Sequence, residues 1–150
     1  MPAYEYPRPA LTVDAVVFRG AAGSREVLLV RRGLEPFLGG WALPGGFVDE
    51  DERLEHAVRR ELAEETGLAS AGRMRQVGTF GDPGRDPRGW TVSVAFLLDL
   101  GESGPVEVRG ADDADEAAWH PLDALPPLAF DHDRIIAAAL TTCDAATANG

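Results

Sequence analysis

The chain has 150 residues, of which 45% are hydrophobic, and its 14 basic and 25 acidic residues give a formal net charge of −11. This length suits one domain with its own core, so we expect residues 1–150 to form a single domain with 144–150 as a frayed tail. The negative charge speaks against a role in coating nucleic acid, because the field of the protein repels polyanions. A small anionic substrate is compatible with this charge if a divalent cation bridges protein and phosphate.

The sequence also speaks against export and membrane insertion. Residues 1–7 lack the basic and apolar regions of a signal peptide, and no apolar run approaches the roughly 18 residues that span a bilayer. The single cysteine, Cys143, cannot form an internal disulfide, which fits a reducing compartment. We therefore expect a soluble, cytoplasmic protein that contacts no membrane.

The first half of the chain predicts two strands followed by a helix. Segments rich in β-branched residues at 11–18 and 26–30 are joined by the turn at 20–24. A loop over 31–40 then leads to Pro44-Gly45-Gly46, which interrupts regular backbone structure. The segment 51–66 predicts a helix, because acids fill its first turn, Leu54, Val58 and Leu62 are spaced by four, and Gly67 follows as a terminating residue.

The second half predicts mostly strands and one closing helix. Strands are expected at 75–80, 90–100, 106–108 and 117–120, a Pro/Gly loop at 81–89, and a helix at 131–140 followed by an irregular end. Helices interleaved with β segments indicate an α/β protein in which a mixed β-sheet is covered by helices on both faces.

Three glutamates of the first helix lie along its buried edge. At 100° per residue, Glu61, Glu64 and Glu65 fall within about one 100° sector, and Leu54 and Val58 point into the same sector. Like charges at this spacing repel each other, and burial adds to the cost. A hard divalent cation removes both penalties, and oxygen ligands suit Mg²⁺ or Mn²⁺. The alternative is a solvated acidic helix with arginine partners, which the angular placement and the preceding Gly-Gly turn disfavour.

The segment 46–68 resembles the Nudix signature, G-x5-E-x7-R-E-U-x-E-E-x-G-U, in which U is a bulky aliphatic residue. The defined positions are filled by Gly46, Glu52, Arg60, Glu61, Leu62, Glu64, Glu65, Gly67 and Leu68. The resemblance implies the Nudix fold, an α/β/α sandwich with a mixed β-sheet. It also implies a metal-dependent hydrolase that cuts a nucleoside diphosphate linked to another group.

The same resemblance implies a role for each matching residue. Glu61, Glu64 and Glu65 would ligate Mg²⁺ or Mn²⁺, and the Gly45 carbonyl would add one more oxygen. Arg60 would hold Glu61 through a charge-assisted hydrogen bond. Glu52 would support the loop at the helix start and contact a metal-bound water. The metal would lower the pKa of a bound water and offset charge on the anhydride.

The segment 46–68 is called the box below. The loops outside the box resemble those of small prokaryotic ADP-ribose pyrophosphatases. Pro83 stands 16 residues after Gly67, where such enzymes carry a marker proline, and segments 35–37, 82–89 and 128–132 are also similar. This resemblance predicts ADP-ribose as the substrate, cut to AMP and ribose 5-phosphate. We expect substrate contacts from Arg85 and Arg88, with Arg31 and Arg32 as rival phosphate ligands. Candidates for stacking on adenine are Phe37, Phe80, Trp90 and Phe130, although core packing is the commoner role of an aromatic residue.

A further acid is expected from outside the box. The only dense acidic cluster after the box is 112–116. In similar sequences the acid three residues before the tryptophan serves as a base or metal ligand, and here that residue is Glu116, with Asp115 as its competitor.

Two other functions stay open. A sanitising nucleoside triphosphate pyrophosphohydrolase would share the box, although the Pro83 loop speaks against it. A non-catalytic, ADP-ribose-sensing Nudix domain often loses box carboxylates, whereas this box is complete. Resemblance alone favours a homodimer.

Overall fold

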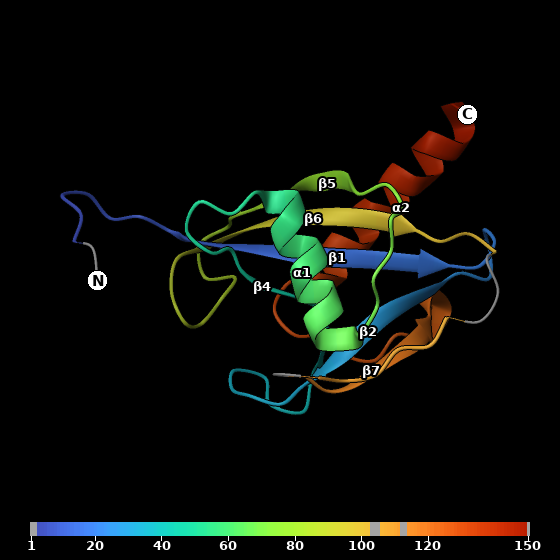
Figure 1. Ribbon diagram of the computed structural model, residues 1–150, viewed down its shortest axis with the longest axis horizontal. Helices are drawn as coiled ribbons and strands as arrows, with labels where there is room; N and C mark the ends of the chain where they lie inside the picture. Colours follow the sequence, from blue (N-terminus) through green and yellow to red (C-terminus); the bar gives the residue numbers. More distant parts are fainter. Residues whose placement is uncertain (1–2, 103–105, 112–113, 150) are drawn as a thin grey trace.

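The computed structural model describes residues 3–102, 106–111 and 114–149 (Figure 1). Within them the chain forms β1 (Ala10–Arg19), β2 (Glu26–Arg32), β3 (Trp41–Ala42), β4 (Gly45–Phe47), α1 (Leu54–Thr66), β5 (Arg75–Phe80), β6 (Thr91–Asp99), β7 (Ala114–Pro121), a 3-10 turn (Leu122–Ala124) and α2 (His132–Asn149). The expected strands at 11–18, 26–30, 75–80 and 90–100 are confirmed to within two residues at each end. Among these residues, neither helix combines the length and apolar character needed to cross a membrane.

The strands form one mixed, seven-stranded sheet. The order along the sheet is β3-β2-β1-β6-β5, while β4 pairs with β1 and β7 pairs with β2. β1 and β6 run parallel from Ala10↔Thr91 to Phe18↔Asp99. β4 pairs antiparallel with 12–14 of β1, whereas β2 pairs with its last residues, 18–19. β1 therefore changes its neighbour on one side along its length, and the candidate site lies at the β4 end.

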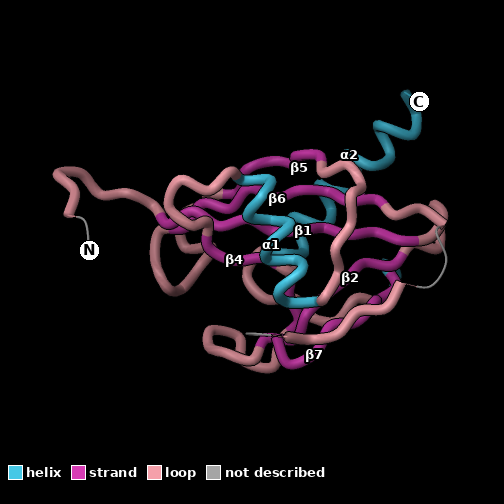
Figure 2. The backbone as a smooth tube through the Cα atoms, in the orientation of Figure 1, coloured by secondary structure: helices cyan, strands magenta, loops and turns pink. Residues whose placement is uncertain are grey.

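One helix covers each face of the sheet, so the expected α/β/α sandwich is confirmed (Figures 1 and 2). Alternate residues of β1 serve the two sides, as the two-residue period of a strand requires. Val13, Ala15 and Val17 belong to the cluster beneath α1, whereas Val16 and Phe18 belong to the cluster beneath α2. A strand buried on both faces reads as a continuous apolar run, which explains the sequence of β1.

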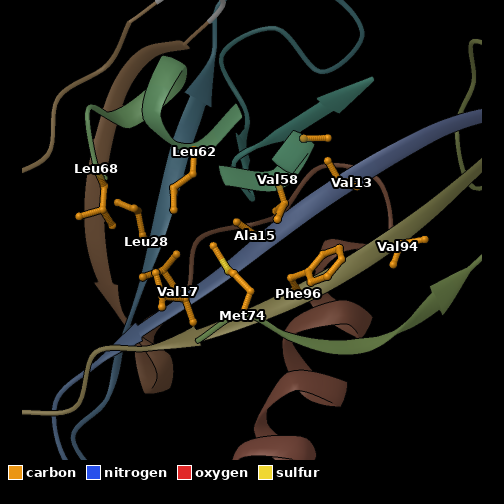
Figure 3. Close-up of a cluster of buried hydrophobic side chains, with 12 residues drawn as sticks. Val13, Ala15, Val17, Leu28, Val58, Leu62, Leu68, Met74, Val94 and Phe96 are labelled. Carbon is orange, nitrogen blue, oxygen red and sulfur yellow. The ribbon is translucent and has the colours of Figure 1, made fainter. Parts of the chain in front are cut away.

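The core beneath α1 fixes the helix that carries the box. Figure 3 shows Val58 and Leu62 pointing from α1 toward the sheet, where Leu28 and Val17 also contribute. Both helix residues are at most 2% exposed, and each buried aliphatic side chain of this size contributes roughly 1.5–3 kcal/mol. The predicted inner face of the helix is confirmed.

The helix begins three residues later than the sequence predicts. Asp51 has a φ of 61°, which lies in the left-handed region and cannot continue into a right-handed helix. The acids at 49–52 instead form a turn, in which the Glu52 N–H donates to the Asp49 carbonyl at 3.1 Å. The predicted end is confirmed, because Gly67 is left-handed and its N–H donates to the Ala63 carbonyl at 2.9 Å.

The prediction of a strand at 106–108 is wrong. This segment is irregular, although Val106 and Val108 still pack against the cluster beneath α1. The Val106 carbonyl accepts a hydrogen bond from the Trp119 indole at 3.0 Å, so side-chain contacts take the place of strand pairing. The next strand begins at Ala114 instead of residue 117, because β7 pairs with β2 from that point.

The last helix is longer than predicted. α2 continues beyond Leu140 to Asn149, through the segment expected to be frayed. Alanines favour this extension, and Cys143 is buried in the cluster beneath α2, where its thiol donates to Asp99 at 3.4 Å. Burial and the neighbouring Asp99 raise the pKa of Cys143, so this residue is a protonated core side chain and not part of a tail.

Candidate active site

A cavity of about 320 Å³ lies between β1, β4, β6, α1, the loop over 82–89 and the start of α2. Seven of the residues expected at the site line it: Arg32, Gly45, Glu61, Glu65, Arg85, Arg88 and Phe130. Six lie outside its lining: Arg31, Glu52, Arg60, Glu64, Pro83 and Glu116. The fold therefore brings Gly45 and box residues together with loop residues, although Gly45 and Phe130 stand 85 positions apart in the sequence.

Arg60 ties the start of the box to its glutamates. Its Nε and Nη2 donate to the two oxygens of Glu52 at 2.7 and 2.9 Å, and Nη1 donates to Glu61 at 2.9 Å and to Glu64 at 3.3 Å. The expected Arg60–Glu61 hydrogen bond is thus present. Glu52 also accepts the Asp49 N–H at 3.0 Å, and these donors, Arg60 first, hold the pKa of Glu52 well below its usual range. His56 is exposed and lies beside Glu52.

The glycine pair is required by close approach of its neighbours. A Cβ on Gly46 would lie 2.7 Å from the carboxylate of Glu61, and one on Gly45 would lie 2.2 Å from the Val13 carbonyl oxygen. Neither distance is tolerable for a side chain, so only glycine lets β4 lie against both β1 and α1. The Gly45 N–H points toward Glu65, with 3.4 Å between the nitrogen and Oε2.

Glu61 and Glu65 are adjacent carboxylates in a partly buried position. Burial, followed by the charge of Glu61, raises the pKa of Glu65 to about 8. The two residues are one helical turn apart, so they repel each other when both are ionised. Glu64 differs, because 45% of its side chain is exposed and its carboxylate meets Arg60.

The oxygen donors fit a hard divalent cation, although they are not gathered around one point. Among the residues that the structure describes, no three His, Cys, Asp or Glu side chains form a ready cluster for a metal ion. Arg60 occupies part of this region, because Nη1 donates to both Glu61 and Glu64. The fit rests on the Glu61–Glu65 pair, whose repulsion and burial a cation would relieve.

Arg85 and Arg88 play different parts in the loop over 82–89. Arg85 is 5% exposed and forms a two-bond pair with Asp131, at 2.9 and 2.6 Å, while Nη1 donates to Ser93 at 2.8 Å. The guanidinium group of Arg85 therefore makes its hydrogen bonds within the protein. Arg88 is 41% exposed and is held by the buried Asp86 at 2.8 Å, so it faces the cavity with a fixed orientation.

Phe130 lines the cavity and has arginine and aromatic side chains around its ring. The guanidinium groups of Arg32 and Arg88 lie 5.1 and 5.4 Å from its ring centroid, and Phe37 meets it edge-on at 4.8 Å. Of the other stacking candidates, Phe80 packs against the cluster beneath α2 and Trp90 is 55% exposed. Neither Phe80 nor Trp90 lines the cavity.

Arg31 and Glu116 lie opposite each other across β2 and β7. Arg31 pairs with Glu116 and Arg32 pairs with Ala114, so β7 has one extra residue between them. Consecutive strand residues face opposite sides, and it is Arg32 and Ala114 that line the cavity. The structure therefore directs Arg31 and Glu116 away from it, and Glu116 is exposed on a strand instead of a loop. The neighbouring acids Asp112 and Asp113 lie outside the described residues.

The sequence interpretation missed a polar group on the floor of the cavity. Asp14 and His132 are both buried, and the Leu43 N–H donates to His132 Nδ1 at 3.0 Å. Burial lowers the pKa of His132 to about 3 and raises that of Asp14 to about 7, the latter partly offset by the charge of Arg85. The signal for Asp14 was present in the sequence, because it is the one charged residue within the apolar run 11–18.

Comparison with known proteins agrees with this geometry. A model of the NUDIX domain family matches residues 8–139. An ADP-ribose pyrophosphatase from Methanocaldococcus jannaschii is 43% identical over 131 residues, which cover 87% of this chain and 73% of that protein. The match therefore covers most of both chains.

Two solved structures share the fold. The NUDIX domain of Shewanella oneidensis NrtR, in complex with ADP ribose, superposes with a TM-score of 0.83 at 38% identity, covering 92% of this chain and 90% of that domain. A bifunctional NMN adenylyltransferase/ADP ribose pyrophosphatase from Francisella tularensis, complexed with AMP and a manganese ion, gives 0.81 at 30% identity. Here 93% of this chain matches only 43% of that protein. With its complete box, its fold and these matches, the chain belongs to the Nudix family.

Proposed function

We propose that the protein is a metal-dependent pyrophosphohydrolase that hydrolyses ADP-ribose to AMP and ribose 5-phosphate. The observation that carries the proposal is a single cavity that joins the box carboxylates Glu61 and Glu65 to Arg32, Arg88 and Phe130. The first group suits a cation that binds a pyrophosphate, and the second suits a nucleotide with an aromatic base. The similar archaeal enzyme and the ADP-ribose complex of the similar NrtR domain support this substrate.

In this proposal Glu61, Glu65 and the Gly45 carbonyl hold Mg²⁺ or Mn²⁺, with Glu64 and Glu52 in supporting positions. When bound, the metal lowers the pKa of a water and offsets charge on the phosphate oxygens. Arg60 keeps Glu61 oriented through the 2.9 Å hydrogen bond. The manganese ion in the similar Francisella tularensis protein supports a divalent metal.

The substrate side of the proposal rests on Phe130, Arg88 and Arg32. Phe130 would stack on the adenine, and the two arginines would contact phosphate or ribose. Arg85 would have an indirect role. Through its hydrogen bonds to Asp131 and Ser93, it would hold the loop over 82–89 against β6 and the start of α2. Pro83 would limit the freedom of the same loop, within the turn in which the Arg85 N–H donates to the Asp82 carbonyl at 3.3 Å.

We predict that ADP-ribose is hydrolysed with a far higher kcat/KM than any nucleoside triphosphate. The physical reason is that the cavity places the aromatic ring of Phe130 and the guanidinium group of Arg88 beside the box carboxylates. A panel of nucleotides assayed with Mg²⁺, with products separated by chromatography, checks this. A triphosphate favoured by tenfold or more would reject ADP-ribose and support the sanitising alternative.

Arg88→Ala should raise the KM for ADP-ribose with a smaller change in kcat. Arg88 faces the cavity beside Phe47 and Phe130, so it should bind substrate and transition state about equally, and loss of uniform binding raises KM alone. Arg73→Ala, an exposed arginine outside the cavity lining, is the matched control. An unchanged KM with a collapsed kcat would make Arg88 a transition-state residue instead.

A second candidate is an ADP-ribose sensor without activity, which the ADP-ribose complex of the similar NrtR domain favours. The substrate panel separates the two functions, because a sensor would bind ADP-ribose in calorimetry and release no AMP. The complete set of box carboxylates supports the enzyme.

We also propose that the protein works in the cytoplasm as a homodimer. The cytoplasmic location rests on the single cysteine, Cys143, which cannot form an internal disulfide, and the dimer rests on the resemblance to small ADP-ribose pyrophosphatases. Light scattering of the purified protein measures the oligomeric state directly.

A further inference from the structure

Asp14 is a buried carboxyl group for which the roles described so far do not account. It lies in the middle of β1, is 6% exposed and lines the cavity. Its Oδ2 is buried and has no hydrogen-bond partner among the described residues. Leaving a buried polar oxygen unpaired costs free energy, and such atoms in native proteins usually mark a ligand or a functional role. An unpaired Oδ2 at this position therefore points to a bound ligand as its hydrogen-bond partner.

Among the described residues, the groups around Asp14 give Oδ2 no hydrogen bond, although the Ser93 hydroxyl beside this carboxyl lowers its pKa. His132, at the start of α2, holds Nε2 3.7 Å from Oδ1, beyond hydrogen-bond distance. β4 presents Gly45, where even a Cβ would stand 2.6 Å from Oδ1. On the loop side, Arg85 directs its nitrogens to Asp131 and Ser93. Ser93 itself shares a hydrogen bond with Thr12.

The surroundings favour a neutral hydrogen-bond donor over a cation. Of the charged groups that act on Asp14, Arg85 acts most strongly, followed by Asp131 and Arg88, and the two arginines oppose the binding of a cation at Asp14. Phosphate oxygens are anionic acceptors and cannot supply the donor. A nucleotide ligand then has only its sugar hydroxyls and its base amine to offer.

Of these donors, the sugar hydroxyls fit best. Asp14, Thr12 and Ser93 place a carboxyl and two hydroxyl groups side by side on β1 and β6. Such a set pairs with the adjacent hydroxyls of a ribose, which both donate and accept. Phe130 provides the aromatic surface for the base elsewhere in the same cavity.

We propose that Asp14 is a specificity-determining residue that accepts a hydrogen bond from a ribose hydroxyl of bound ADP-ribose. The inference rests on the proposed function above and adds the group that selects the sugar. ADP-ribose carries two riboses with the same chemistry, one on the adenosine and one at the terminal end, and the experiment separates them.

The test measures kcat/KM for ADP-ribose and for its 2′-deoxy (adenosine ribose) and 2″-deoxy (terminal ribose) analogues. We expect Asp14→Ala to lose about tenfold or more with ADP-ribose, and Asp14→Asn, which keeps an acceptor oxygen, to lose less. One deoxy analogue should cost the natural enzyme about tenfold, whereas the same analogue should cost Asp14→Ala little, because coupled groups are not additive. The analogue that shows the coupling identifies the ribose. Asp123→Asn, exposed and outside the cavity lining, is the control.

Several results would overturn the assignment. One is Asp14→Ala discriminating among the three substrates as the natural enzyme does. Another is coupling of Asp14 to the base. In that case, replacing the adenine of ADP-ribose with hypoxanthine would lower kcat/KM for the natural enzyme but not for Asp14→Ala. If thermal melting shows that both variants are unfolded, equal kcat/KM of the natural enzyme for all three substrates rejects the proposal.

The proposed function can fail separately. If the natural protein binds ADP-ribose without hydrolysing it, the enzyme assignment fails, and calorimetric affinities for the same three ligands decide the role of Asp14. Absence of binding to all three rejects both proposals.

Discussion

Replacing Glu65 with glutamine should lower kcat by on the order of 10² or more at saturating Mg²⁺. The substitution keeps the size of the side chain and removes a charge where a cation is proposed to bind. Folding should be preserved, because the pKa of Glu65 is raised to about 8 by burial and by Glu61. A raised carboxyl pKa means that the ionised form is disfavoured in the folded protein. Glutamine removes this penalty, which grows as the pH rises above the usual carboxyl pKa of about 4.5 and is complete above about 8, so the melting temperature should stay level or rise.

The control for this substitution is Glu55→Gln on the same helix. Glu55 is exposed and pairs with Arg59 at 3.4 Å, away from the cavity, so its loss should leave turnover and melting temperature unchanged. Circular dichroism and thermal melting check the fold, and a Mg²⁺ titration checks the metal. Near-normal turnover of Glu65→Gln at saturating Mg²⁺ would remove Glu65 from the metal assignment.

The box was predictable because its geometry is local. Helical periodicity alone places Glu61 and Glu65 on one edge, and the Arg60–Glu61 contact joins adjacent residues. The same reasoning misjudged Glu64, which shares the angular sector but lies nearer the solvent, where Arg60 holds it. Periodicity gives an angle around the helix, whereas exposure also depends on how far the neighbouring strand extends.

Apart from Asp14, the floor of the cavity was not predictable, because it depends on pairing between distant strands. Thr12 and Ser93 meet only through the parallel register of β1 and β6, 81 positions apart. Arg85 was expected to contact substrate, but its guanidinium group donates hydrogen bonds to Asp131, 46 positions away. Likewise, the direction of Glu116 is set by the extra residue of β7 at the Arg31/Arg32 step, which no sequence pattern indicates.

The identity of the proton acceptor is the other question with a large expected effect. Glu116 stays a prediction of the sequence, but its carboxyl group lies on the side of β7 away from the cavity. A role in chemistry would require the start of β7 to rearrange when ligand binds. Glu61 already lines the cavity, beside the glycine pair, and Arg60 fixes its orientation. We therefore propose Glu61 as the residue that accepts the proton from the attacking water.

Glu61→Gln should then lower kcat by about 10² to 10⁴, the usual cost of losing a general base, whereas Glu116→Gln and Asp115→Asn should leave it nearly unchanged. All three variants are measured at saturating Mg²⁺, so that differences in metal affinity do not enter the comparison. The three variants are compared for kcat at saturating ADP-ribose, with melting temperatures to confirm folding. A large loss in Glu116→Gln with a small one in Glu61→Gln would mean that β7 does rearrange, and that the base comes from outside the box. If Asp115→Asn alone shows the loss, the acid three residues before Trp119 is the wrong choice by one position.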